Sequence, residues 1–340
     1  MLYVSKAALD TIVGANFARQ DLSPVIGLLT TRPRPVTQFA PKVKATNTIH
    51  QWVEQGRNPV GPANATYAQG ALPGTQAIAP VRPQNITCRT GVTAQVTDDE
   101  AAVWSGAGSW KLQQGEEERL MQEAIDLQVE LATLDVLDQL EWMHIQGDST
   151  NPQAMSGGQT DGLIKWITAS GIAFATGGTS AAAATFTEQM VKDAARLSAE
   201  AYPTLLADTM LIPPELQVDI NSFVGGGAGR PITQIVAAGP DGTQSMVGGN
   251  SVGFYNTGYS VVKIALEPSL SPLFNASLLN PAVIMYNKAN VKHASLIDLA
   301  AEPLARTDTS VKKMVTTVYA QEHRVPPHAS ILSNIKSAIL

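Results

Sequence analysis

The sequence predicts an α+β fold in which one long helix is combined with separate groups of strands. Residues 116–146 contain no Gly or Pro, so they can form one continuous helix that ends at Gly147. Strand-prone runs gather before this helix and in the last third of the chain, and they do not alternate with helices as βαβ units would. With 340 residues, 44% of them hydrophobic, the chain is long enough for two or three compact units.

The first 44 residues are expected to form an extended arm after a short helix at 5–18. This segment has six basic residues and two acidic ones. Pro24, Pro33, Pro35 and Pro41 follow one another closely, and prolines at this density disfavour a helix and favour an extended backbone. An arm of this composition cannot bury itself, so it should become ordered on a neighbouring molecule.

Two strand-like runs, at 46–51 and 84–96, flank a long Gly- and Pro-rich stretch at 54–82. Together they predict a protruding two-stranded loop, and loops longer than ~12–15 residues usually have a function. The second run places alternate residues on one face, namely Ile86, Cys88, Thr90, Val92 and Ala94. Cys88 is the single cysteine of the chain, so no intrachain disulfide forms, and we interpret it as a packing residue.

The helix predicted at 116–146 would be about 46 Å long at ~1.5 Å per residue. One side is broad and apolar, whereas acidic residues recur on the other side, which we expect to be solvated: Glu123, Asp126, Glu130 and Glu141. Taken alone, this helix fits either the central helix of an ordinary domain or an acidic rod that lines a surface.

The rest of the chain predicts shorter elements of both kinds. A short apolar piece lies at 163–167, and an amphipathic helix at 187–201 has Met190, Ala194, Leu197 and Ala201 on its inner row. Pro213 and Pro214 start a helix at 215–223, because proline suits a first turn. Strands are expected at 205–212, 254–255, 259–264, 283–286, 313–321 and 329–332.

Catalytic and metal-binding patterns are weak. The sequence has no phosphate-binding loop, and a net charge of −6 argues against a dedicated nucleic-acid binder. A G-x-S-x-G match around Ser251 is followed by candidate partners, which are Asp298, Asp308, His323 and His328. A β-prone segment follows the serine where a hydrolase needs a helix, so a soluble serine hydrolase using Ser251 is a minor alternative.

Three histidines are given neither a catalytic nor a metal-binding role. His323 and His328, next to Glu322, are expected to be polar surface residues and not metal ligands, because their segment is broken by two prolines. His144, near the end of the long helix, is also given a structural role. We therefore predict no catalytic residue, no metal ligand and no cofactor site.

The order of elements resembles that of a known family, and local runs support the likeness. These runs are TIHQW at 48–52, DQLEWMHIQGD at 138–148, GLIKWIT at 162–168, LLADTMLIPPELQVDI at 205–220, and the tail from Lys292 to Leu332. Over essentially the whole chain, the sequence resembles a major capsid protein of a tailed bacteriophage with the Hong Kong 97-type fold.

The resemblance implies a division of the chain and a set of contacts. It assigns an N-terminal arm to 1–44, an extended loop to 45–92, a peripheral domain with its spine helix to 93–165, an axial domain to 166–285 and a return to the peripheral domain to 286–340. Candidate contacts with neighbouring subunits are Arg32, Arg34, Trp52, Arg57 and Arg82. The acids of the spine helix would line the inner wall, where they would not hold packaged DNA tightly.

The resemblance also implies partners and a location. Copies would form the pentamers and hexamers of an icosahedral head that encloses double-stranded DNA. Their contact with this DNA would be weak and non-specific. A portal and separate scaffold or decoration proteins would join them, with no membrane partner, and assembly would take place in the cytoplasm of the bacterial host before the protein resides in the virion. An encapsulin-type compartment is the nearest alternative.

Two departures from some relatives lead to further expectations. The arm starts at residue 1 with no heptad-rich helix before it, so no fused scaffolding segment is expected. Some relatives cross-link through a lysine in the extended loop, whereas this chain has no lysine between Lys44 and Lys111. We therefore expect a non-covalent shell.

Overall fold

A computed structural model describes residues 32–55, 79–97, 116–150, 159–170, 173–175, 183–201, 203–225, 253–273, 280–305, 310–325 and 328–338. These residues divide into two compact units. The first unit contains residue 32 and residues 92–97, 116–134, 301–305 and 310–315. The second unit contains all other described residues.

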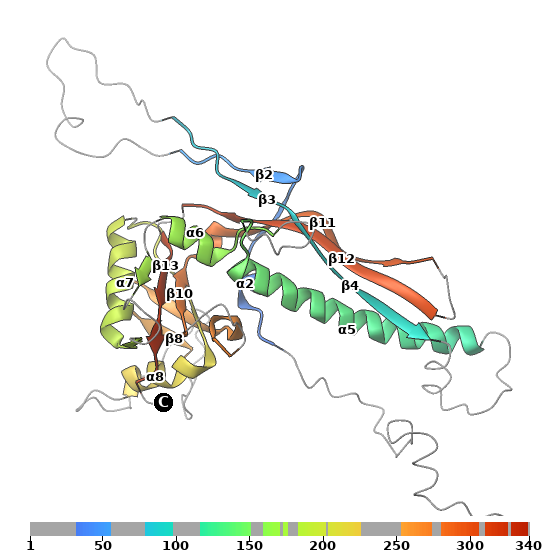
Figure 1. The fold of residues 1–340 in the computed structure, drawn as a ribbon. Helices are drawn as coiled ribbons and strands as arrows, with labels where there is room; N and C mark the ends of the chain where they lie inside the picture. Colours follow the sequence, from blue (N-terminus) through green and yellow to red (C-terminus); the bar gives the residue numbers. More distant parts are fainter. Residues whose placement is uncertain are drawn as a thin grey trace, which may run out of the picture. The chain divides into compact units, whose positions relative to one another are not determined.

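A six-stranded sheet in the second unit has the order β5-β13-β10-β7-β9-β8. Figure 1 labels its strands β13, β10 and β8. Its strands are β5 (Ala173–Ala175), β7 (Thr209–Ile212), β8 (Phe254–Asn256), β9 (Val261–Leu266), β10 (Val283–Tyr286) and β13 (Ser330–Ser333). The central strand β10 is antiparallel to both β13 and β7. All four residues of β7 and of β10 are buried, as expected of strands that are covered on both faces.

Each face of this sheet has its own apolar core. On one face, Met210, Ile212, Val283 and Met285 pack with helices α7 (Glu188–Ala201) and α8 (Pro214–Gly225). On the other face, alternate residues such as Leu211 and Ile284 pack with α6 (Leu163–Ser170), with Val36 and with Ile145. The strand period of two therefore divides one sheet between two cores.

The inner row of α7 differs from the one predicted. The buried residues are Val191, Ala194, Ala195 and Ser198. Of the predicted row, Ala194 is buried, whereas Met190 and Leu197 are half-buried and Ala201 is exposed. The residues of α7 that share a core with Leu332 of β13 are therefore Val191, Ala194 and Ala195, which differ from the predicted row at two of three positions.

A second sheet has four strands in the order β1-β11-β12-β4. They are β1 (Lys42–Lys44), β4 (Cys88–Thr97), β11 (Val291–Pro303) and β12 (Ser310–His323). The predicted alternation is confirmed in β4 from Cys88 to Ala94, where every second side chain is buried or half-buried. It is wrong for Ile86, which is exposed and not on the buried face of Cys88. Two small sheets, β2-β3 and β14-β6, complete the described strands; they join β2 (Ile49–Gln51) to β3 (Gln84–Ile86) and β14 (Ile335–Lys336) to β6 (Ala184–Thr185).

The long helix α5 (Glu116–Gln146) has the predicted bounds (Figure 1). Its buried apolar residues include Ala124, Ile125, Ala132, Val136 and Leu140. In the first unit, Asp126 of α5 pairs with Lys313 of β12 at 2.8 Å. In the second unit, the ring of His144 lies 5.3 Å from that of Tyr319 of β12.

The prediction of a solvated acidic side is wrong for one residue of α5. Asp126 and Glu130 are exposed, as is Asp135. Glu141, by contrast, is only 4% exposed. Its carboxylate is compensated by three hydrogen bonds from residues 36 and 37, which lie far away in the sequence.

The prediction that the proline-rich arm excludes a helix is also wrong at its end. Residues Pro35–Phe39 form the short helix α2. Pro35 stands at the first helical position, where its missing N–H costs no hydrogen bond. The next two N–H groups, of Val36 and Thr37, each donate to Glu141 at 2.7 Å. The helix predicted at 5–18 lies outside the described residues.

Candidate functional site

The two-stranded sheet β2-β3 presents an exposed face with apolar residues. Ile49 lies opposite Ile86, and the two side chains are 46% and 45% exposed. Pairing continues through Trp52 N–H to Pro83 O and through the bridge between Glu54 and Val81. We call the exposed side the outer face of the hairpin, and the register assigns to it Ile49, Gln51, Val53, Arg82, Gln84 and Ile86.

The opposite side of this hairpin is fixed to the rest of the second unit. Trp52 is 5% exposed, and its ring lies 5.6 Å from that of Trp166. Glu54 accepts hydrogen bonds from Trp52 Nε1 at 2.9 Å and from the Val325 N–H at 3.0 Å. His50 Nε2 lies 3.0 Å from the buried carboxylate of Glu322. The base of the hairpin is therefore held by side chains on alternate positions, while the outer face is left open.

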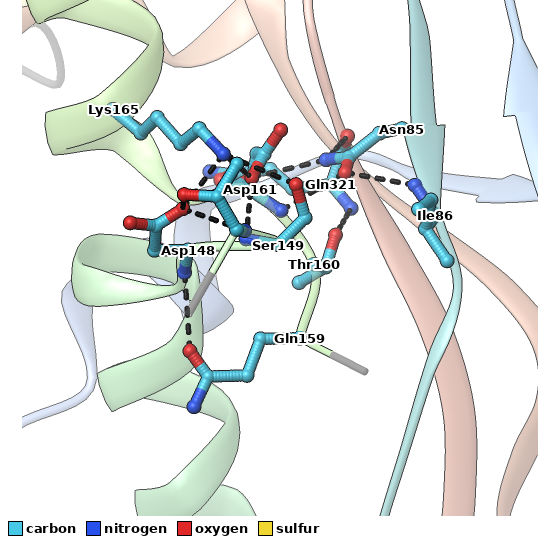
Figure 2. Close-up of polar contacts among 10 residues, drawn as sticks. Asn85, Ile86, Asp148, Ser149, Gln159, Thr160, Asp161, Lys165 and Gln321 are labelled. Carbon is cyan, nitrogen blue, oxygen red and sulfur yellow. Dashed lines mark hydrogen bonds and ion pairs between the residues drawn. The ribbon is translucent and has the colours of Figure 1, made fainter. Parts of the chain in front are cut away.

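Asn85 ties β3 to two other segments (Figure 2). Its side-chain nitrogen donates to Asp161 O at 3.0 Å and to Gln321 O at 2.8 Å. Its side-chain oxygen accepts from the N–H groups of Asp161 and Ile86, both at 2.9 Å. Because the side chain is only 2% exposed, water cannot replace these partners.

Lys165 stabilises the adjacent loop, as Figure 2 shows. Its ammonium group pairs with Asp148 and Asp161, each at 2.7 Å. Asp161 also accepts from the Ser149 N–H at 2.7 Å. The Lys165 hydrogen bond, followed by those of Thr150, lowers the pKa of Asp148 to about 2. The loop that receives Asn85 is therefore itself held by charge-assisted hydrogen bonds.

Replacing Asn85 with Ala should lower the free energy of unfolding by about 2–4 kcal/mol, because it leaves buried backbone groups of Asp161 and Gln321 without partners. Urea unfolding of the dissociated subunit measures this loss. Gln51→Ala is the matched control, since it removes an exposed amide that bonds Gln84 at 3.0 Å. Equal effects of the two substitutions would contradict the role given to Asn85.

The five predicted contact residues fall in different environments. Arg32 and Arg82 are exposed, and Arg82 lies on the outer face. Arg34 is partly buried and pairs with Asp138 of its own chain. Trp52 is buried within its own subunit, and Arg57 lies outside the described residues.

The interpretation of His323 and His328 as surface residues is wrong. Both are buried, with ring centroids 5.3 Å apart, and the neighbouring Glu322 is 1% exposed. Burial and then the nearby His328 lower the pKa of His323 to about 3, and burial lowers the pKa of His328. Both rings are therefore neutral near pH 7. The prediction failed because β12 carries His323 into the interior, which the proline content of the following sequence does not indicate.

The other candidate catalytic residues form no described constellation. Ser251 and Asp308 lie outside the described residues, and Asp298 is exposed on β11. Cys88 is buried, and burial raises the pKa of its thiol, which makes it a weak nucleophile. The part of the chain that the structure describes contains no cluster of three or more metal-ligating side chains.

His144 and His293 form a second buried pair. His144 Nε2 lies 3.0 Å from His293 Nδ1, and the ring of Tyr319 stacks on His293 at 5.2 Å. Burial, followed by the other histidine, lowers the pKa of His144; burial, followed by Lys42, lowers that of His293 to about 4. One neutral imidazole therefore donates to the other, in agreement with a structural role for His144.

Within the described ranges, no helix is long and apolar enough to cross a membrane.

Comparison with known proteins shows the fold and the family. The model of the SU10 major capsid protein family matches residues 9–336. No curated protein matches the sequence. A solved structure from Mycobacterium phage Ogopogo has a TM-score of 0.59 at 8% identity, covering 99% of this chain and 100% of that one. The capsid of Myoviridae phage XM1 has a TM-score of 0.54 at 13% identity, covering 95% and 98%.

An encapsulin also has a similar fold. An encapsulin complex from Synechococcus elongatus has a TM-score of 0.54 at 10% identity, with coverage of 98% and 97%. The fold is therefore of the Hong Kong 97 type, as the resemblance implied. Because the family model covers nearly the whole sequence, the chain belongs to the SU10 major capsid protein family.

Proposed function

We propose that this capsid protein builds an icosahedral head around double-stranded DNA and that copies join in part through the outer face of the hairpin. The observation that supports this is the contrast between the two sides of β2-β3. Ile49 and Ile86 are nearly half exposed, whereas Asn85 and Trp52 on the opposite side are buried. A rigid base with an open apolar face suits contact with a second copy.

The hairpin gains from such a contact. Two-stranded sheets are marginally stable in water, and this one has cover on one side only. Covering the exposed parts of Ile49 and Ile86 would contribute about 1 kcal/mol each, from ~25 cal/mol per Å² of apolar surface. Arg82 and Val53 belong to the same face, so Arg82 remains a proposed contact. Trp52 supports the hairpin from within its own chain.

The finer organisation is likewise a proposal. Pentamers and hexamers would form the shell, a portal and separate scaffold or decoration proteins would join it, and assembly would take place in the bacterial cytoplasm. Contact with DNA would be weak and non-specific, because the net charge is −6 and Asp126, Glu130 and Asp135 of α5 are exposed. The division into arm, extended loop, peripheral domain and axial domain is proposed with the bounds given above.

Negative-stain microscopy of the purified protein tests the proposed function. Closed shells of uniform diameter are expected, and particles from infected cells should contain DNA. An encapsulin-type compartment is the second candidate, because an encapsulin shares the fold. Shells that contain a protein cargo and no DNA would favour the compartment, and a protein that never assembles would contradict both. Labelling of Ser251 by a fluorophosphonate probe would revive the hydrolase alternative.

The shell should be held together without covalent bonds between subunits. The extended loop lacks lysine throughout the interval from Lys44 to Lys111, so it offers no amine for an isopeptide bond. Boiling mature particles in denaturant should release this chain as one band at its 35.9 kDa on a denaturing gel, identified by an antibody against it. A ladder of larger species would contradict this prediction.

A further inference from the structure

Two acidic residues near the end of α5 hold the chain where α2 begins. Asp138 pairs with Arg34 Nε at 2.5 Å. Glu141, one turn later, accepts from the Val36 N–H through Oε1 and from the Thr37 N–H through Oε2, both at 2.7 Å. The Thr37 hydroxyl also donates to Oε2, at 2.6 Å. These contacts join two segments that are 104 or 105 positions apart in the sequence.

Glu141 takes the place of the usual cap of α2. The residue before this helix is Arg34, whose side chain forms no capping hydrogen bond with the described residues. An arginine side chain has only donors, so it cannot accept from the first N–H groups of a helix. A helix of five residues is also too short to be stable by itself. Glu141 therefore supplies the acceptors from another part of the chain, and its charge strengthens the hydrogen bonds.

Packing and strand pairing hold the same stretch. Val36 is completely buried and shares a core with Ile145 near the end of α5. Beyond α2, strand β1 pairs in parallel with residues 293–295 of β11. Pro33, by contrast, is exposed. The chain is therefore attached to its own subunit from Arg34 to the end of β1.

We propose that Asp138 and Glu141 clamp the root of the N-terminal arm, so that the arm leaves its own subunit at Pro33. We call these two side chains, together with residues 34–40, the arm clamp. Only its consequence for assembly rests on the proposed function, since the clamp itself belongs to the single subunit. The clamp divides the proposed arm into a part that is fixed on its own subunit and a preceding part that can bind neighbouring subunits.

The clamp depends more on Glu141 than on Asp138. Glu141 is 4% exposed, so water cannot replace it as the acceptor for the first turn of α2. The side chains of Arg34 and Asp138 are 14% and 25% exposed, so solvent partly screens their ion pair. We therefore expect a larger effect from a substitution of Glu141.

Hydrogen–deuterium exchange of the full-length, dissociated subunit tests the clamp. In Glu141→Gln, the side chain keeps its shape, but an amide donor replaces one acceptor oxygen and the charge is lost. A donor of α2 then has no partner in the closed state, so the exchange of residues 36–40, corrected for the intrinsic rate, should rise about tenfold or more. Exchange at β10, which is buried along its whole length, should remain slow, because α2 opens while the rest of the unit stays folded.

Two further variants of α5 are matched to Glu141→Gln. Asp135→Asn makes the same change from carboxylate to amide on an exposed residue, and it should alter the exchange of residues 36–40 by less than about twofold. Asp138→Asn removes the ion pair with Arg34 and should give a rise between those of the other two variants. Unchanged exchange at residues 36–40 in Glu141→Gln would overturn the clamp. An equal rise at β10 would also overturn it, because the hold would then be inseparable from the global fold.

Substitutions of Thr37 decide the question if Glu141→Gln does not fold. Thr37→Val removes the hydroxyl that donates to Glu141 and should raise the exchange of residues 36–40 about fivefold. Thr37→Ser keeps a hydroxyl and should match the wild type. Equal exchange in the two variants would contradict the clamp.

Shell yield, measured by sedimentation velocity, tests whether the clamp serves assembly. Glu141→Gln should lose assembled shell relative to Asp135→Asn, because an arm with a free root loses more conformational entropy when it binds a neighbour. An open clamp together with a normal shell yield would overturn the role in assembly. If the wild type itself never assembles, the proposed function fails, and the exchange result still decides the clamp.

Discussion

Gly147→Ala is expected to lower the free energy of unfolding by about 3 kcal/mol or more. A Cβ atom at this position would lie 2.2 Å from Thr160 O and 2.6 Å from Met143 O. Both are backbone oxygens, so no side-chain rotation relieves the overlap. The Gly147 N–H also donates to Met143 O at 2.9 Å, and the Gly162 N–H donates to Gly147 O at 2.8 Å, which fixes the end of α5.

Urea unfolding of dissociated subunits, followed by tryptophan fluorescence, measures this effect. Gly253→Ala is the control, because a Cβ there meets nothing within 4 Å. The control should change stability by less than about 0.5 kcal/mol. Equal stability of Gly147→Ala and Gly253→Ala would contradict the close approach of Thr160 O to Gly147.

The second large effect is expected on assembly. Replacing both Ile49 and Ile86 with Asp should reduce the amount of assembled shell at least tenfold and leave the subunit folded. The substitutions remove apolar contact and place two carboxylates in a buried interface, which costs several kcal/mol per uncompensated charge. The same contact recurs in every subunit, so a small loss of contact free energy per subunit adds up over a whole shell.

Sedimentation velocity gives the fraction of particles, and circular dichroism with thermal unfolding gives the state of the subunit. Ile49→Val with Ile86→Val is the matched control, because it keeps an apolar, β-branched face, and it should assemble. Normal shells from the Asp variant would exclude the outer face as a contact. An unfolded Asp variant would show that these half-exposed residues stabilise the subunit itself.

Much of the fold could be predicted because it depends on local sequence patterns. The bounds of α5 follow from an uninterrupted helical stretch that ends at Gly147, and those of β10 from a short run of large apolar residues. The start of α8 follows from Pro213 and Pro214. The helices α5 and α8 form their backbone hydrogen bonds within themselves, and β10 lies wholly inside a core. Their hydrophobic patterns in the sequence are therefore strong.

The errors have a common physical origin, which is support from distant residues. Helix α2 has only five residues and is stabilised by Glu141, a residue 105 positions after Val36. Strand β11 was missed because its run of Ala, Asp and Glu has low β-propensity, yet β1 and β12 pair with it on both sides. His323 was placed at the surface because its neighbours are prolines, whereas β12 is buried continuously from Val315 to its end.

The candidate site was predicted in part. Two strands flanking a long loop were expected, and Arg82 lies on the outer face. Ile49 and Ile86 were not predicted to be contact residues. The alternation in TIHQW nevertheless places the side chain of Ile49 on the face opposite to those of His50 and Trp52. Asn85 gave no signal, because an amide that bonds backbone atoms of two distant segments has no sequence motif.

A cryo-electron microscopy reconstruction of the assembled shell tests the central claim most directly. The map would show what covers the outer face of the hairpin in each subunit. We predict that Ile49 and Ile86 are buried against a second copy of the chain, while Trp52 and Asn85 keep their contacts within their own subunit. A shell in which Ile49 and Ile86 still face solvent would contradict the account.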